Sequence, residues 1–419
     1  MRIISSPIRH ILLFTLLIGM LFLSSCDGFK RPYPNYVKLE PIAPIVTTDL
    51  IPVVENQKII HKKLKVATLL PLTGKNKDLG GSMLNSIVLS LFENDKNNDI
   101  ELVILDSSNI KKAATQIINQ DITVVIGPIF SSSTQELKKE LQGKKISVLS
   151  FSNNRDLINN DNVFLMGFLP EQQIDKISSY SISAGKDNFS IIAPNNRYGQ
   201  IYATILQEMV RKKDGNFITS EFYSNTKKDL ERAVAKVVKS YNSTSDKSQK
   251  NLTKEDKFYT NVILIPASGK TLSKITTLIN KFNVDGRDIQ ILGNNSWDEN
   301  STLNDPNLIG GWFTSSDPAK YLDFEKRYYK SYQKFPTRMN SIGYDASLAV
   351  IKTLETLEER KLMPEDLINY QSANNGFDGI DGLFRFLPNG IVQRNFAILE
   401  VQNRKFEMID SPSTMFFKY

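Results

Sequence analysis

The chain has 419 residues and a formal net charge of +7, from 52 basic and 45 acidic side chains that are interspersed along most of its length. The sequence has no basic stripe with interleaved aromatic residues, so we expect no nucleic-acid partner. Its single cysteine is Cys26, and its two histidines are His10 and His61. This distribution excludes disulfides, Cys/His zinc sites and histidine-dependent triads from the main body of the chain. We expect no metal, no cofactor and no enzymatic activity, although composition leaves carboxylate or Ser-Lys chemistry open.

Residues 1–25 have the pattern of an export signal. Two arginines precede an uncharged apolar run at 11–22, which is shorter than the roughly 20 residues that a membrane-spanning helix needs. Small residues then lead into Cys26, which resembles the lipobox of bacterial lipoproteins and implies lipid attachment at that thiol. The alternative is a plain signal followed by a chance cysteine. Asp27 favours an inner-membrane anchor in the lipoprotein sorting of many Gram-negative bacteria, and an outer-membrane anchor stays open.

The segment 26–62 reads as a tether. It has prolines at positions 32, 34, 41, 44 and 52. Such a composition favours an extended, polyproline-like chain, which at ~3.1 Å per residue reaches on the order of 100 Å. We expect it to let an anchored, folded domain search space away from its membrane.

From residue 65 onward, short β-branched runs alternate with amphipathic helical patterns. The predicted strands are 65–72, 101–107, 123–128, 146–152, 189–194, 261–268 and 289–294. Alternation of this kind predicts doubly wound α/β architecture, and the length predicts two such parallel-sheet lobes. Lobe 1 is expected at 63–175 with 318–383 returning to it. Lobe 2 is expected at 176–317 with 384–419 returning.

Three further segments lie in the second half of the chain. The polar stretch 240–258 is nearly free of apolar residues and predicts a surface loop. The aromatic residues at 321–335 recur at helical spacing, which favours a helix packed on the sheet over a partner surface. The end of the chain predicts antiparallel strands joined by the turn "LPNG" at 387–390.

Several motifs in order resemble the type I periplasmic binding proteins. They are Pro71-Leu72-Thr73-Gly74, a glycine at 80 or 81, Gly127-Pro128 with its following serines, "LSFSNN" at 149–154, and Tyr198-Gly199. The resemblance spans nearly all of 65–419 and implies a two-lobe fold with a ligand between the lobes.

The resemblance also implies which residues face that ligand. In the family, the serine after the third strand and the turn after the fourth hold a carboxylate, and the tyrosine covers the ligand from the other lobe. The candidate cleft residues here are Ser131, Ser132, Ser152, Asn154, Tyr198 and Asn295. Alternatively, one of the serines at 131–133 caps the helix that begins there. The two tryptophans, Trp297 and Trp312, line the cleft rim or pack in the core.

One departure from the amino-acid receptors concerns charge. Their acidic residue after the strand at 289–294 pairs with the ligand ammonium, whereas this sequence has Asn294 and Asn295 there. An asparagine supplies no charge, and Asp298 is offset from the position. The sequence therefore argues against ordinary α-amino-acid binding.

A narrower resemblance concerns "LSFSNN" and the stretch from Gly379 to Val401. Both are similar to lipoproteins described as penicillin-binding protein activators, which implies a peptidoglycan synthase as partner. We expect a regulator in the cell envelope, facing the periplasm. The alternative is a receptor that delivers an amino acid, a peptide or a small carboxylate to an ABC-type transporter.

Overall fold

The computed structural model describes residues 63–158, 162–224, 226–248, 261–283, 288–359, 361–370, 372 and 375–416. The expected signal, the lipid attachment at Cys26 and the tether lie outside this part of the chain. Ile60–Tyr419 form one compact unit. Within the described ranges, no helix combines the length and apolar composition that crossing a membrane requires.

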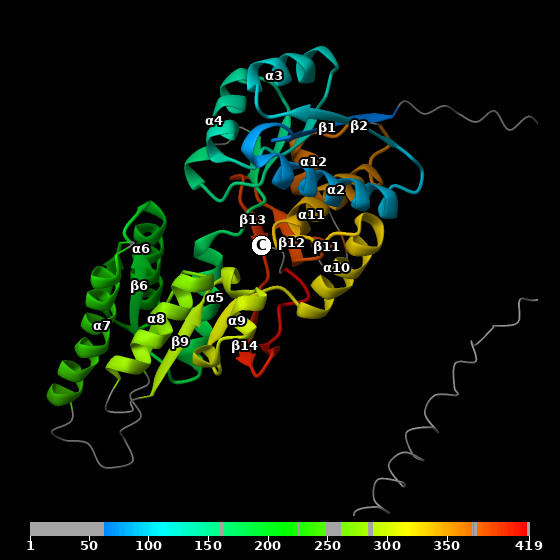
Figure 1. Cartoon of the computed structure of the whole chain (residues 1–419). Helices are drawn as coiled ribbons and strands as arrows, with labels where there is room; N and C mark the ends of the chain where they lie inside the picture. Colours follow the sequence, from blue (N-terminus) through cyan, green and yellow to red (C-terminus); the bar gives the residue numbers. More distant parts are fainter. Residues whose placement is uncertain are drawn as a thin grey trace, which may run out of the picture. The chain divides into compact units, whose positions relative to one another are not determined.

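Lobe 1 is built on a parallel sheet with the strand order β2-β1-β3-β4-β5. Its strands are β1 (Leu64–Leu70), β2 (Ile100–Asp106), β3 (Val124–Ile126), β4 (Ser147–Ser150) and β5 (Val163–Leu165). One face packs against α3 (Ile110–Asn119) and α4 (Ser131–Glu140), as Figure 1 shows. The other face packs against α2 (Lys77–Asn94), α11 (Asn340–Leu354) and α12 (Pro364–Asn369). Lobe 1 is therefore doubly wound.

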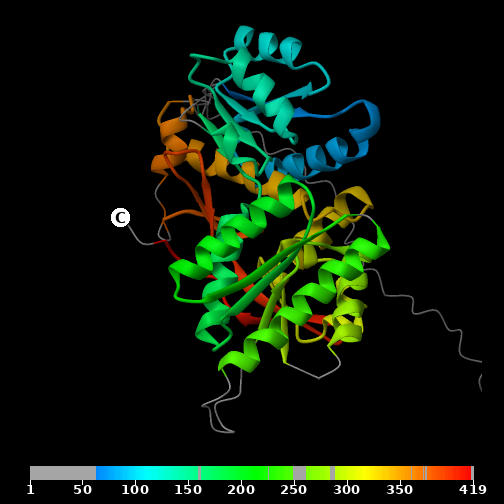
Figure 2. The same cartoon turned by 90° about the vertical axis from the view of Figure 1, so that its left-hand side faces the viewer.

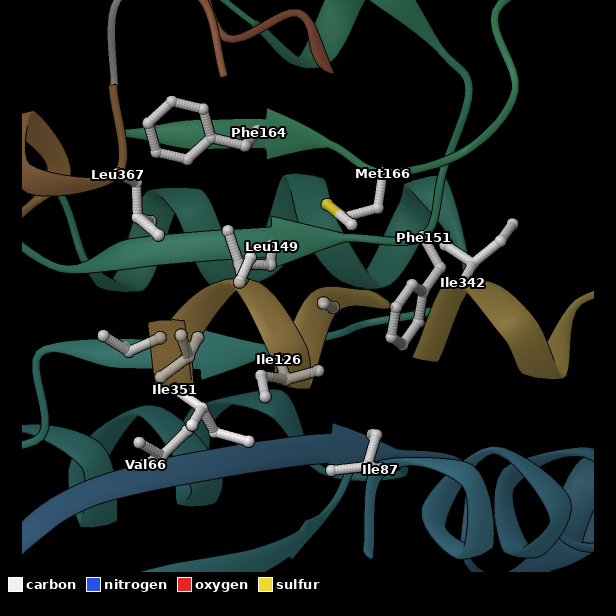
Figure 3. Close-up of a cluster of buried hydrophobic side chains, with 14 of the residues drawn as sticks. Val66, Ile87, Ile126, Leu149, Phe151, Phe164, Met166, Ile342, Ile351 and Leu367 are labelled. Carbon is white, nitrogen blue, oxygen red and sulfur yellow. The ribbon is translucent and has the colours of Figure 1, made fainter. Parts of the chain in front are cut away.

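The core on the α2 and α11 face combines segments that are far apart in the sequence. Val66, Ile126 and Leu149 come from three strands and face Ile87 of α2 and Ile351 of α11 (Figure 3). All five side chains are at most 2% exposed. Burial of such a residue stabilises the fold by about 1.5–3 kcal/mol. This core fixes the returning helices to lobe 1.

Lobe 2 is built on a sheet with the order β15-β14-β10-β9-β8-β6-β7. Its parallel strands are β6 (Asn188–Pro194), β7 (Asn216–Tyr223), β8 (Asn261–Leu264), β9 (Ile289–Gly293) and β10 (Trp312–Ser315). The antiparallel strands β14 (Ala397–Gln402) and β15 (Lys405–Asp410) complete it. Helices α5 (Pro170–Ser183) and α6 (Arg197–Lys212) cover one face, while α7 (Lys227–Ser248) and α8 (Gly269–Phe282) cover the other.

Close packing at one glycine in each lobe sets the start of a helix against a strand end. A Cβ atom on Gly80 of α2 would lie 2.1 Å from the carbonyl oxygen of Pro71, and one on Gly199 of α6 would lie 2.0 Å from that of Pro194. Gly81 has open space at the same position. The motif glycine of the first helix is therefore Gly80.

A small antiparallel sheet joins the end of the chain to lobe 1. It consists of β11 (Phe377–Gly379), β12 (Gly382–Phe386) and β13 (Val392–Arg394), and the turn at 387–390 connects the last two strands. Phe384 and Phe386 belong to the lobe 1 core. In Figure 2 the chain continues from the orange strands beside lobe 1 to the red strands in the sheet of lobe 2.

The crossings between the lobes differ from the expected boundaries. Within the described residues the chain passes between the lobes after β5, after β10 and after β13. The expected boundary at 383/384 falls inside β12, because the phenylalanines of that strand pack into lobe 1. The boundary at 175/176 falls inside α5, because Ile174 already belongs to the lobe 2 core.

All seven predicted strand segments form strands, which confirms that part of the prediction. The prediction of a loop at 240–258 was wrong for its first half, because α7 continues through Ser248 and Tyr241 is buried against the sheet. Residues 249–260 lie outside the described part. The aromatic stretch forms α10 (Pro318–Tyr332), whose Tyr328 and Tyr332 hydroxyls donate to carbonyls of α2 at 3.1 and 2.8 Å. The prediction that this helix packs on the sheet was wrong, because its aromatic side chains pack against α2 and α11.

Candidate ligand site at the sheet edges

The candidate serines lie at the start of α4, where β3 ends. Ser131 is half-buried and Ser132 is exposed, and their hydroxyl groups have no hydrogen-bond partner among the described residues. The N-cap is Phe130, which makes no side-chain cap, so the prediction of a capping serine was wrong. Thr134 is the buried hydroxyl of this turn, 2.7 Å from Ser150 Oγ. The first-turn N–H groups and both serine hydroxyls can therefore donate to an anion.

The turn after β4 uses its polar atoms mainly for its own shape. The buried Ser152 Oγ accepts a hydrogen bond from the Asn154 backbone N–H at 3.1 Å. Asn154 Oδ1 accepts from the Asp156 N–H at 3.2 Å and caps a short 3-10 helix at Arg155–Leu157. The Ser152 hydroxyl proton and the Asn154 side-chain N–H groups remain for a ligand.

An ion pair joins this turn to lobe 2. Asp156 pairs with Arg197, the first residue of α6, and both side chains are well exposed. Arg197 precedes Tyr198 in the sequence, so the ion pair links the two lobes next to the tyrosine. Exposed ion pairs of this kind contribute less than about 1 kcal/mol, so the contact can open without a large penalty.

Asn294 is the centre of the lobe 2 half of the site. It follows β9 and is buried, and its Nδ2 donates to the hydroxyls of Tyr198 at 2.8 Å and Tyr202 at 2.7 Å. Its Oδ1 accepts from the Ser296 hydroxyl at 2.6 Å. The tyrosine rings lie 4.6 Å apart, and loss of water around their hydroxyls raises the pKa of both. The amide thus holds two neutral tyrosines in place.

Asn295 contributes its backbone to the site. Its N–H donates at 2.9 Å to Oε1 of Gln173, a buried residue of α5 that also accepts from Thr314 Oγ1 at 3.2 Å. The Asn295 side chain is half-buried and has no partner in the described part of the chain. Sequence reasoning missed Gln173, because a glutamine on an amphipathic helix is usually a surface residue.

The carboxylate of Asp298 forms an ion pair with Arg338, an arginine of lobe 1. Its Oδ2 accepts from Arg338 Nε at 3.0 Å and from Ser315 Oγ at 2.5 Å. Arg338 also reaches Asp381 Oδ1 at 2.6 Å, and it lies 4.1 Å from the ring centroid of Tyr321. Burial by itself lowers the pKa of Arg338, but the charges of Asp381 and Asp298 raise it by more. The net pKa is above its ordinary value, so the guanidinium stays charged. Asp298 is therefore unavailable to a ligand ammonium.

A second arginine continues this buried network. Arg394 and Asp345 are both buried, and their atoms NH1 and Oδ2 lie 3.1 Å apart. The second terminal nitrogen of Arg394 donates to the Met166 carbonyl at 3.4 Å. Met166 follows β5 and Arg394 ends β13, so the network connects two of the crossings between the lobes. The burial of Asp345, and then the nearby Asp381, raise the pKa of Asp345 to about 7.

The tryptophans lie in the core and not at a rim. Trp297 is fully buried, and its Nε1 donates to the Ile265 carbonyl at 3.1 Å. Trp312 is 9% exposed and donates to Glu400 Oε2 at 2.9 Å. Among the described residues, no group of three or more His, Cys, Asp or Glu side chains is placed to hold a metal ion.

The site therefore offers hydrogen-bond donors to a ligand, and the two aspartates near them are already paired. Serine hydroxyls, helix N–H groups and amide N–H groups suit a carboxylate, while Asp156 and Asp298 are each paired with an arginine.

Parallel-sheet lobes joined by several crossings, with polar residues at their carboxyl edges, define a two-lobe binding-protein fold. The chain belongs to the periplasmic binding protein family, whose model matches residues 63–405. Membership in this family assigns it to the cell envelope.

Two curated relatives have similar sequences. A Rickettsia prowazekii protein is 24% identical over 365 residues, which are 83% of this chain and 90% of the relative. The penicillin-binding protein activator LpoA of Vibrio antiquarius is 24% identical over 186 residues, which are 42% of this chain and 30% of the relative. The chain thus matches less than a third of that activator.

Solved structures share the fold. The C-domain of Haemophilus influenzae LpoA, described as a regulator of PBP1A, aligns with a TM-score of 0.60 and 17% identity, over 83% of this chain and 99% of that domain. A Rhodopseudomonas palustris solute-binding protein in complex with benzoate aligns with a TM-score of 0.57 and 17% identity, over 84% of this chain and 97% of that one.

Proposed function

We propose that the protein is a membrane-anchored, non-enzymatic lipoprotein that regulates a peptidoglycan synthase through protein contact. The proposal rests mainly on the position after β9, where the amino-acid receptors have the acidic residue that pairs with the ligand ammonium. Asn294 stands there and is bonded to two tyrosines, and Asp298 is bonded to Arg338. A site built in this way lacks the charge that an amino-acid receptor needs.

The relatives support the same proposal. Activator sequences align with this chain at 22–25% identity, and the LpoA C-domain aligns along nearly its whole length. The lipobox-like sequence at Cys26 and the proline-rich tether suit a protein that reaches a membrane enzyme from its own anchor. The partner in this proposal is a penicillin-binding protein with glycan-polymerising activity.

A direct test measures polymerisation. The purified lipoprotein in detergent is added to the bifunctional peptidoglycan synthases of the source organism, and glycan-chain formation from lipid-linked precursor is followed. The proposal predicts a faster rate with one synthase and co-purification of the pair. Unchanged rates with every synthase, together with no co-purification, would refute it.

The alternative function is a receptor for a small carboxylate that lacks an ammonium group. The unpartnered hydroxyls of Ser131 and Ser132 favour it, as does the position of Tyr198 on the facing lobe. The benzoate complex of a solved structure with this fold has a ligand of that class. A melting-point rise with a carboxylate, abolished in Ser131→Ala, would support the receptor, and the polymerisation test would then be negative.

A further inference from the structure

A second candidate site lies at the opposite edge of the lobe 1 sheet. A groove of about 720 Å³ is lined by the start of β1, the turn from α3 into β3 and the segment before β4. These are the amino ends of parallel strands, whereas Ser131 and Ser152 follow carboxyl ends. The groove is therefore separate from the candidate ligand site.

The rim of this groove is strongly basic. Its lysines are Lys63, Lys65, Lys144, Lys145 and Lys361. Lys65 is half-buried and the others are exposed, and none of them has an ion-pair partner in the described ranges. Asp121 is the acidic residue in the lining, and Glu101 lies beside Lys65 in the strand register. Five ammonium groups around one groove repel each other and favour an anionic partner.

The floor of the groove is apolar. Leu64, Ile117 and Ile146 line it and are each less than 9% exposed. These three side chains are buried, so the accessible part of the groove presents mainly its lysines and polar side chains. The phosphates of phospholipid headgroups suit a basic surface of this kind.

The position of the groove along the chain points to the same partner. Lys63 and Lys65 are the residues at which the N-terminal segment enters lobe 1. That segment carries the apolar run at 11–22 and Cys26. The groove thus lies at the end of the domain that is covalently joined to the proposed membrane anchor.

We propose that the basic groove formed by Lys63, Lys65, Lys144, Lys145 and Lys361 binds the surface of an anionic phospholipid membrane. The exposed lysines attract the headgroup phosphates at the surface of the bilayer. This electrostatic contact adds to the lipid anchor and holds the domain close to the bilayer. This inference does not depend on which protein partner the domain has.

Vesicle binding tests the inference without the lipid anchor. The protein used comprises Asp27 to Tyr419, so it lacks Cys26 and any lipid attached there. It is sedimented with phosphatidylcholine vesicles, with and without phosphatidylglycerol. Binding is expected with phosphatidylglycerol only and is expected to weaken steeply as salt rises, because the lysines are exposed. No binding to the anionic vesicles, or binding that 0.5 M salt leaves unchanged, would overturn the proposal.

Matched variants locate the surface. Each lysine near an anionic bilayer strengthens binding by about fivefold, so Lys144→Gln, Lys145→Gln and Lys361→Gln together should weaken it by at least about tenfold. Lys326→Gln, Lys330→Gln and Lys334→Gln remove the same charge from exposed positions on and just after α10 and should leave binding nearly unchanged. Equal loss in both triple variants would overturn the groove as the site. Binding of soluble polyphosphate without vesicle binding would overturn the membrane as its occupant.

Discussion

Asp298 Oδ2 lies 3.0 Å from Arg338 Nε, and this ion pair joins the loop after β9 of lobe 2 to the segment before α11 of lobe 1. Both side chains are only about one-sixth exposed, at 16% and 15%. The pair neutralises the acidic residue nearest to the expected ammonium position and also ties the lobes together. The same contact therefore has a structural role and limits which ligands the site can accept.

Removal of Arg338 should strongly destabilise the fold. Arg338→Gln leaves Asp298 and the buried Asp381 without their cation, and breaking a buried pair of this kind costs about 3–5 kcal/mol. The measurement is the free energy of unfolding from urea titration. Lys352→Gln, which breaks an exposed pair with Glu355, is the matched control and should change it by less than about 0.5 kcal/mol. Similar effects for both variants would contradict a buried network.

The free energy of unfolding should depend on pH because of the protonation of Asp345. Asp345, Asp381 and Asp298 face two guanidinium groups, those of Arg394 and Arg338, so one negative charge lacks a partner. The folded pKa of Asp345 is about 7, above its ordinary value of 3.8. The folded state thus binds more protons than the unfolded state between these values. The contribution of Asp345 to the free energy of unfolding is therefore largest below about pH 4. It is lost as the pH rises to about 7, by up to about 1.4 kcal/mol per pH unit.

The variant Asp345→Asn should remove this dependence. Unfolding free energies of both proteins are measured from pH 4 to 8, and their difference should change with pH only below about 7. Asp323→Asn, at an exposed site on α10, is the control and should keep the wild-type profile. A constant difference between wild type and Asp345→Asn across the range would contradict the assignment.

The Asn294 amide should stabilise lobe 2. Asn294→Leu removes the donor to both tyrosines, and the Tyr202 hydroxyl is buried, so we expect a loss of about 1–3 kcal/mol. Asn295→Ala is the neighbouring control, because that residue uses its backbone N–H and not its side chain. Melting by circular dichroism distinguishes the two. Equal melting points for both variants would show that the amide does not support the tyrosines.

Two adjacent glycines should respond in opposite directions. Gly80→Ala places a methyl group 2.1 Å from the Pro71 carbonyl oxygen and should destabilise the protein by more than about 1 kcal/mol. Gly81→Ala meets open space on the same helix and should stabilise it by about 0.5–1 kcal/mol. Chemical denaturation of both variants tests the register of α2 against the strand end. The opposite order would contradict it.

The strands that could be predicted are those whose burial is continuous. β6 and β8 are apolar runs covered on both faces, and such runs stand out in any sequence. β7 lies at the sheet edge and is mostly half-buried with polar residues, so no run marks it. β5 has only three residues, too few to show a period.

The site could be predicted only in part, for a similar reason. A strand end followed by small polar residues marks Ser131 and Ser152 locally. The partners of Asn294 lie 92 and 96 residues away, and Arg338 lies 40 residues from Asp298. Contacts at such separations depend on how the strands cross over, which no local pattern contains. The missing acid was visible in the sequence, whereas the neutralisation of Asp298 was not.

The site lacks the negative charge that an α-amino acid needs, so a melting-point comparison of two matched ligands should distinguish a carboxylate from an amino acid. Isoleucine and 3-methylpentanoate share a side chain and a carboxylate, but only isoleucine has an ammonium group. A ligand at ~1,000 times its dissociation constant adds about 4 kcal/mol and raises the melting point by several degrees. We predict no rise with isoleucine at any concentration. A saturable rise with isoleucine that 3-methylpentanoate does not produce, and that Tyr198→Ala abolishes, would contradict the account.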